Sequence, residues 1–224
     1  DAATLARVAD LEQRLARIDA TSAALVATAD SAAAQSGRAE ALLAAFAARR
    51  AIESGKPLGY LEGQLRLRFG AALPNVVNGL IGFARQPVTH DRIVTQFEVL
   101  APQLVGPDEA SSWTKIKRDL SGLFVLHSSS AANAPSPKMR LDHARLCLKE
   151  GKIEAAIADV RLLPGAKAAA QWIADATRYA EAMRGLDALD TAALLEPKLL
   201  KDGAGRPIEQ ASPIAQAPEA SSAP

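Results

Sequence analysis

Apolar side chains recur every three or four residues along most of this chain, with polar residues between them. That spacing predicts amphipathic helices. Alternation with period two, which a half-buried strand shows, is confined to runs too short for a sheet. The sequence therefore predicts an all-α protein whose helices are divided by Gly and Pro residues.

The most regular pattern lies in the first 34 residues. Apolar or small residues there alternate steps of three and four, the a/d spacing of a heptad repeat. The seam comprises Thr4, Val8, Leu11, Leu15, Ile18, Ser22, Leu25, Ala29 and Ala32. We expect this seam to be the end of a coiled coil that brings copies of the chain together, chiefly through its larger apolar members. The alternative is one amphipathic helix packed on its own domain.

Helices also account for the next third of the chain. A break near Ser36 and Gly37 opens a second helix, which ends at Gly55 by an ordinary stop signal. Two shorter helical segments follow within 60–86. Thr89 is the expected N-cap of a further helix that begins at His90.

The second half contains more helices and two segments without periodicity. Residues 127–137 have the composition of a loop. From Pro197 onward too few apolar groups are present to offset the entropy of ordering, so we expect disorder there. The expected helices cover 111–126, 144–165 (a pair joined at Gly151), 166–186 and 187–195.

These patterns divide the chain into four consecutive segments. The first is the end of the coiled coil, the second a helical region that connects or binds lipid, the third a C-terminal helical domain and the last a disordered Ala/Pro-rich tail. Their bounds are 1–36, 37–106, 107–196 and 197–224.

Composition narrows the classes of function. Hydrophobic residues make up 49% of the chain but aromatic residues only 4%, which favours helices packed closely through small side chains. The formal net charge is +1, whereas a nucleic-acid binder normally shows a strong basic excess, so we expect no nucleic-acid partner. The single cysteine, Cys147, excludes an internal disulfide. No apolar run is long enough to cross a bilayer, and the start at Asp1 fits a mature or truncated product.

Reactive chemistry is sparse. His90, His127 and His143 sit in different segments and show no spacing that indicates a metal site with Cys147 or a carboxylate pair. Cys147 lies on a helix near Ala144, where a buried inert thiol is far commoner than a nucleophile. The sequence contains no GxSxG, phosphate-binding loop or HExxH motif. We therefore expect no catalytic residues, no metal, no cofactor and no enzyme activity.

One region combines cations with apolar side chains. Such a segment can lie on a membrane, where cations meet anionic headgroups and apolar groups enter the interface. The candidate lipid-binding residues are Leu42, Leu43, Phe46, Arg49, Arg50, Lys56, Arg66 and Arg68. The alternative is a helix that packs in the core with snorkelling arginines.

Two tryptophan-bearing helices supply further candidate surfaces for a partner. Trp113, Ile116, Leu120 and Phe124 share one helical face, and Trp172 belongs to an i, i+3, i+4 stripe. Both faces can instead dock on the domain's own helices, with the tryptophans as core anchors.

From Trp113 to about Leu186 the chain resembles the C-terminal domain of the mitofilin family, the membrane-anchored subunit of the MICOS cristae-organising complex, and specifically its alphaproteobacterial relatives. The order of elements carries the resemblance. A tryptophan-bearing helix is followed by a Pro-containing loop, a helical hairpin with glycine at its turn, Leu-x-Gly, and tryptophan before an alanine-rich helix. The matching positions are Trp113, Leu123, Gly151, Ala155, Leu163, Gly165, Trp172 and Ala176.

The resemblance implies a non-enzymatic scaffold that shapes or tethers a bacterial inner membrane. Its anchor would lie in a segment absent from this chain, and this region would lie in the periplasm. The coiled coil would oligomerise, the middle helices would contact an anionic membrane surface, and the C-terminal domain would dimerise or bind an envelope or outer-membrane protein. The long Ala/Pro-rich tail departs from the family.

Two other interpretations remain. Residues 144–165 also resemble one tetratricopeptide repeat, which would make the chain a soluble helical adaptor, although no second copy recurs at a fixed period. An enzyme whose site only the fold assembles is the third and least favoured interpretation.

Overall fold

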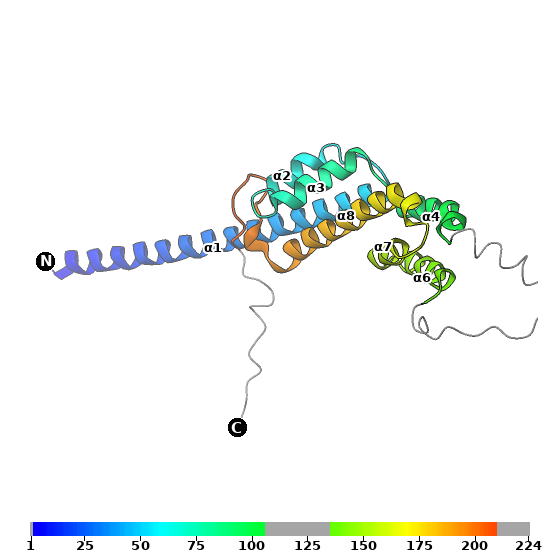
Figure 1. Cartoon of the computed structure of the whole chain (residues 1–224). Helices are drawn as coiled ribbons and strands as arrows, with labels where there is room; N and C mark the ends of the chain where they lie inside the picture. The colour runs from blue at the N-terminus through cyan, green and yellow to red at the C-terminus, as the bar shows by residue number, and fades with distance from the viewer. Residues whose placement is uncertain (1, 106–134, 210–224) are drawn as a thin grey trace, which may run out of the picture. The chain divides into compact units, whose positions relative to one another are not determined.

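The computed structural model describes residues 2–105 and 135–209, with side chains described from residue 7 onward. Within these ranges the protein is all-α and contains no strand, which confirms the predicted fold class. The elements are α1 (Ala2–Glu53), α2 (Leu61–Phe69), α3 (Pro74–Arg85), α4 (His90–Leu104), α6 (Pro137–Lys149), α7 (Ile153–Arg161) and α8 (Ala170–Leu195), with 3-10 turns at Ala166–Ala169 and Pro197–Leu199 (Figure 1).

The chain divides into two compact units. The described residues of unit 1 belong to the stretches 1–49, 59–78 and 186–224, and those of unit 2 to 50–58 and 79–185. This division differs from the four consecutive segments expected from the sequence. The reason is that α1, α3 and α8 each contribute residues to both units.

Unit 1 is built on small side chains of α1. Ala41, Ala45 and Ala48 are fully buried, and the large buried residues Phe69 of α2 and Leu189 of α8 belong to the same unit. Alanine adds little bulk at a helix contact, so helices can approach closely while keeping a good intrinsic preference for the helical state.

Long helices continue where the sequence predicted breaks. α1 runs without interruption through Ser36 and Gly37, and α8 runs through the predicted boundary between residues 186 and 187, next to Gly185. Both predicted breaks are therefore wrong, because one glycine costs a helix interior only about 1 kcal/mol, which tertiary packing readily offsets. Gly37 is buried, and a Cβ there would lie 3.1 Å from Asp202 Cβ, so glycine makes room for the C-terminal segment.

The segment after α8 is ordered over part of its length. Leu200 and Ile208 are fully buried, and the backbone N–H of Lys201 donates to the Arg68 carbonyl at 3.2 Å. The prediction of disorder from Pro197 is thus wrong for 197–209, while 210–224 lie outside the described residues. The average composition of the segment did not predict this order. The segment is docked by the two buried apolar side chains, Leu200 and Ile208, and by a turn in which Asp202 accepts from the N–H groups of Ala204 and Arg206.

Unit 2 is organised around α4. Thr89 caps this helix as predicted, its hydroxyl accepting from the Arg92 N–H at 3.3 Å. The indole N–H of Trp172 donates to the Ile93 carbonyl at 2.9 Å, and its ring lies 5.5 Å from that of Phe97. Helices α6 and α7 pack side by side (Figure 1) and are joined at Gly151, whose φ of 73° is left-handed and favours glycine.

Gly165 gives a stability prediction. Its N–H donates to the Leu104 carbonyl at 3.0 Å, and a Cβ at this position would overlap the Gln103 backbone and lie 2.7 Å from Leu104 Cα. Gly165→Ala should therefore lower the free energy of unfolding by roughly 2–3 kcal/mol, measured by urea denaturation. The matched control is Gly82→Ala in α3, where a Cβ meets nothing within 4 Å. This control should leave stability unchanged or raise it by up to about 1 kcal/mol. Equal effects of the two substitutions would contradict the close approach at Gly165.

Candidate functional site

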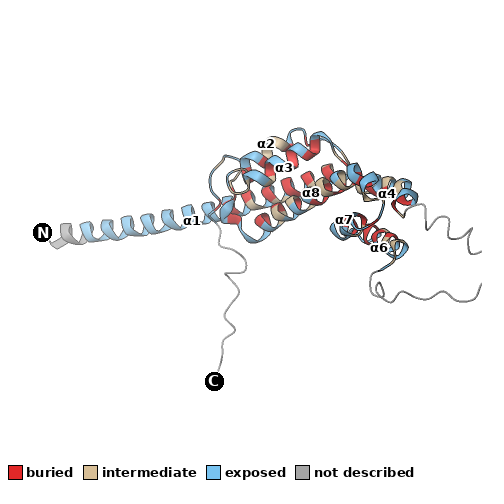
Figure 2. Cartoon of the chain, viewed as in Figure 1, coloured by how far each residue is buried: buried red, intermediate tan, exposed pale blue. Residues whose placement is uncertain are grey.

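The N-terminal part of α1 carries an exposed apolar stripe. Every residue from 7 to 33 is exposed (Figure 2). The seam predicted from the sequence lies on this part of the helix, and its larger members are 50–67% exposed: Val8, Leu11, Leu15, Ile18 and Leu25. Single exposed apolar residues are normal, but a continuous stripe on a solvated helix marks an interaction surface.

The same heptad register continues into the folded part of unit 1. Leu43 and Phe46 fall at the next large a and d positions and are 67% and 49% exposed. The buried residues Ala41, Ala45 and Ala48 occupy the c and f positions, on the opposite side of the helix. α1 therefore uses one face for its own core and leaves the a/d face exposed. Two of the candidate lipid-binding residues thus extend the candidate oligomerisation seam.

The basic cluster does not form one exposed surface. The Arg49 guanidinium lies 2.6 Å from Asp187 Oδ1 and 2.7 Å from Asp190 Oδ2. Arg68 is buried, and it donates to Glu40 at 2.8 Å and to Gln64 at 3.2 Å. These two arginines therefore form contacts within unit 1. This agrees with the alternative interpretation, in which the basic region packs in the core of the protein and does not lie on a membrane.

The remaining members of the cluster differ in exposure. Arg50, Lys56 and Arg66 are exposed, and Arg66 donates to Asn78 at 3.1 Å. Leu42 is half-buried. Of the candidate lipid-binding residues, those that α1 presents to solvent are Leu43, Phe46 and Arg50.

The candidate partner surface at Trp172 is not accessible. This side chain is inside unit 2, and its N–H is already bonded to the Ile93 carbonyl. Its assignment as a partner-binding residue is wrong, and the alternative of a core anchor is correct. A large aromatic ring contributes more to stability when it is buried with its N–H satisfied than when it is left in water. Trp113, Ile116, Leu120 and Phe124 lie outside the described residues.

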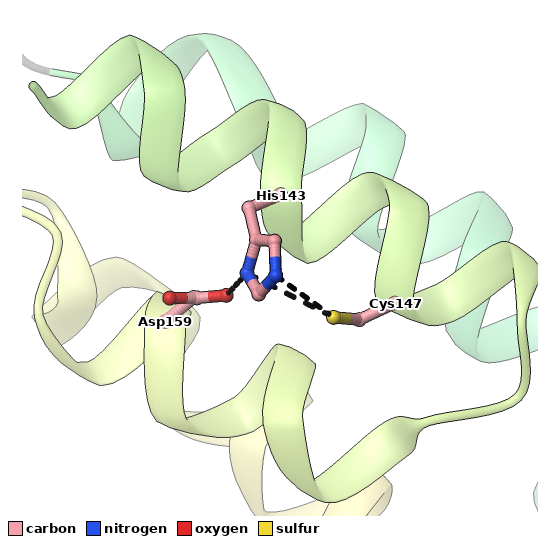
Figure 3. Close-up of side chains that lie close together, drawn as sticks. All are labelled: His143, Cys147 and Asp159. Atoms are coloured by element: carbon pink, nitrogen blue, oxygen red, sulfur yellow. Dashed lines mark hydrogen bonds and ion pairs between the residues drawn. The ribbon is translucent and has the colours of Figure 1, made fainter. Parts of the chain in front are cut away.

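A second candidate site lies between α6 and α7 in unit 2. His143 and Cys147 project from one face of α6 and Asp159 projects from α7 toward them (Figure 3). His143 Nδ1 lies 2.5 Å from Asp159 Oδ2, and Cys147 Sγ lies 3.8 Å from both ring nitrogens. Burial raises the pKa of the Cys147 thiol, and the carboxylates of Asp159 and Glu150 raise it further, so this thiol is protonated at neutral pH.

The sequence analysis did not predict this cluster, although the sequence does indicate that two of its three residues lie close together. The spacing of four residues between His143 and Cys147 puts both on one helical face. Asp159 comes from another helix, so its approach depends on how α6 packs on α7. His90 instead serves the fold, with Nε2 2.9 Å from the Leu148 carbonyl, and His127 lies outside the described residues.

Comparisons with known proteins add no assignment: no family model, no curated protein and no solved structure matches this chain. Among the helices described, none has the length and apolar content needed to span a membrane.

The two roles within the basic cluster can be separated by thermal or urea unfolding. Arg68→Ala removes a buried guanidinium and leaves Glu40 without this partner, so it should cost about 1–3 kcal/mol. Arg50→Ala removes an exposed side chain from the same cluster and should change stability by less than about 0.5 kcal/mol. If Arg68→Ala proves as mild as Arg50→Ala, the Glu40 pair does not stabilise unit 1.

Proposed function

We propose that this chain is a non-enzymatic scaffold whose α1 seam associates with the seam of a second copy, and that it organises a membrane in the manner of the mitofilin family. The exposed a/d stripe on residues 7–33 carries the proposal. Most helical stability in proteins comes from packing an amphipathic face, and within its own chain every residue of this stretch stays exposed. Association with another copy would supply that packing.

The charges beside the seam bear on the orientation of the second copy. With Val8 at an a position, Arg7 and Arg14 fall at g, and Glu12 and Asp19 fall at e. In a parallel, in-register pair each g residue faces the e residue five positions later in the partner, so Arg7 meets Glu12 and Arg14 meets Asp19. In an antiparallel pair g faces g and e faces e, which would oppose like charges. The pattern therefore favours two parallel copies.

Arg14 is available for such a contact. In the single chain it pairs with Asp10 at 2.9 Å, but both side chains are largely exposed. Exposed pairs of this kind contribute only about 0.3–0.5 kcal/mol. Exchange of this pair for one across the coiled coil would therefore cost little.

The membrane role rests on the resemblance together with the exposed side chains of α1. Leu43 and Phe46 present apolar surface one helical turn apart, and Arg50 follows one turn later. Apolar groups that enter the interface beside a cation would suit an anionic membrane surface. Because the two apolar residues also continue the seam, lipid and a second copy would compete for them. The inner-membrane and periplasmic placement belongs to the same proposal.

Self-association can be tested by light scattering coupled to size-exclusion chromatography. Leu15→Asn with Ile18→Asn should weaken association by more than about a hundredfold, because each copy loses two buried aliphatic side chains. The matched control, Ala16→Asn with Ala20→Asn, places the same amides on the b and f positions of the same turns and should associate normally. A wild-type chain that stays monomeric at high concentration would contradict the proposal and favour the soluble adaptor.

Two further experiments test whether the two copies of α1 are parallel. Val8→Cys in a Cys147→Ala background should form an interchain disulfide on mild oxidation, because a parallel register brings the two introduced thiols together. Arg7→Glu with Arg14→Glu should associate poorly alone and recover when mixed with Glu12→Arg and Asp19→Arg. If the wild type associates efficiently but the Val8→Cys variant forms no interchain disulfide, the pair is antiparallel.

Membrane contact can be tested by co-sedimentation with vesicles of phosphatidylglycerol and phosphatidylcholine. Leu43→Gln with Phe46→Gln should lower binding at least about tenfold, because two apolar side chains leave the interface. Arg50→Ala should lower binding at low salt only, since salt screens exposed charges.

Arg49 and Arg68 are left intact so that loss of binding cannot reflect unfolding. The Leu15→Asn, Ile18→Asn variant shows how far binding depends on self-association. Undiminished binding of the Leu43, Phe46 variant would place lipid contact elsewhere.

A further inference from the structure

Three side chains with different ligand atoms converge between α6 and α7. His143 offers a ring nitrogen, Cys147 a sulfur and Asp159 a carboxylate oxygen, and these atoms all lie within 4.8 Å of one another (Figure 3). Neither the coiled coil nor membrane contact uses any of the three. The inference is therefore independent of the proposed function.

We propose that His143, Cys147 and Asp159 bind a zinc ion that ties α6 to α7. A mixed set of nitrogen, sulfur and oxygen ligands suits zinc, which is borderline-soft and has no geometric preference from its d electrons. Tetrahedral zinc bonds of about 2.0–2.3 Å place the ligand atoms roughly 3.3–3.7 Å apart. The separation of 3.8 Å between Cys147 Sγ and the His143 ring nitrogens is close to that range.

One distance must open for the ion to enter. His143 Nδ1 and Asp159 Oδ2 are 2.5 Å apart, which is a hydrogen-bond distance and about 1 Å shorter than two zinc ligands require. The His143 side chain is 61% exposed, so its ring can turn outward without disturbing the core. Zinc would then take the place of the hydrogen bond between these two side chains, and the proton of that bond would pass to the other ring nitrogen of His143 or to solvent.

The charge balance favours a neutral fourth ligand. Zinc binds the thiolate, so the Cys147 proton passes to solvent, and the thiolate and the Asp159 carboxylate together offset the two positive charges of the ion. A surface pocket lined by Pro135, Met139 and Arg140 adjoins His143 and Asp159 and admits water. The Arg140 cation disfavours any further positive charge there. Water in the fourth position would complete a tetrahedral site.

The ligand side chains differ in burial, and this difference determines the side from which the ion would enter. Cys147 is 4% exposed, whereas His143 faces solvent, so the ion would enter from the histidine side and rest against the buried sulfur. Zinc would then add a link between α6 and α7 beyond their packing and the turn at Gly151.

Calorimetric titration of the metal-free, untagged full chain with zinc sulfate tests the site. We expect one zinc ion per chain. Cobalt in place of zinc should give an intense near-ultraviolet thiolate-to-metal band, which only a bound sulfur produces. Cys147→Ala should abolish that band, and His143→Ala and Asp159→Asn should each weaken zinc binding at least tenfold.

The control is Asp142→Asn, which removes a neighbouring carboxylate that pairs with Arg145 at 2.8 Å, and it should bind zinc as the wild type does. All of these variants should keep the wild-type far-ultraviolet circular dichroism, because His143 is exposed, Asn matches Asp in shape and Ala leaves the buried Cys147 position apolar. Zinc should raise the thermal midpoint of the wild type and not that of Cys147→Ala. The absence of stoichiometric binding, or equal binding by Cys147→Ala, would overturn the proposal and leave a His–Asp hydrogen bond beside an inert thiol.

Discussion

The division of α1 into two faces is the constraint on which unit 1 depends. On one face, Ala41, Ala44, Ala45 and Ala48 are buried in the unit, and they are small enough to let other helices approach closely. On the other face, larger apolar residues recur with heptad spacing and stay in solvent. Burial of an alanine side chain gains little hydrophobic free energy, because the gain is about 25 cal/mol per Å² of apolar area removed from water and alanine removes little area. Specific polar contacts therefore matter more here than they would around a thick core.

Arginine supplies many of those contacts in unit 1. Arg38 donates to the Ala193 and Leu194 carbonyls at the end of α8, Arg49 bridges to two aspartates of the same helix, and Arg68 joins α2 to Glu40. The planar guanidinium can serve several acceptors at once, whereas the ammonium of lysine acts as a compact point charge. The basic cluster therefore serves the fold first. Only its exposed remainder is available to an anionic surface.

The two candidate sites also differ in kind. The seam is a property of one helix and follows from a periodic sequence, so its function depends on another molecule. The His143 cluster follows from the packing of α6 on α7, and its chemistry comes from three unlike side chains brought within reach of one another. One chain can contain both kinds of site, since a metal between two helices can stabilise a domain without any role in catalysis.

Within residues 2–105 and 135–209, the sequence by itself predicted most of the helices, the cap at Thr89, the turn at Gly151 and the heptad spacing of α1, because each depends on residues close together in the chain. Tertiary structure decided the rest. α1 continues through Gly37, and α8 through Gly185, because packing offsets the small cost of a single glycine. Residues 197–209 are ordered because Leu200 and Ile208 find buried positions in unit 1. The burial of Trp172 and Arg68 and the approach of Asp159 to His143 join residues distant in sequence. Their separation in space is set by the packing of helices, which no local pattern encodes.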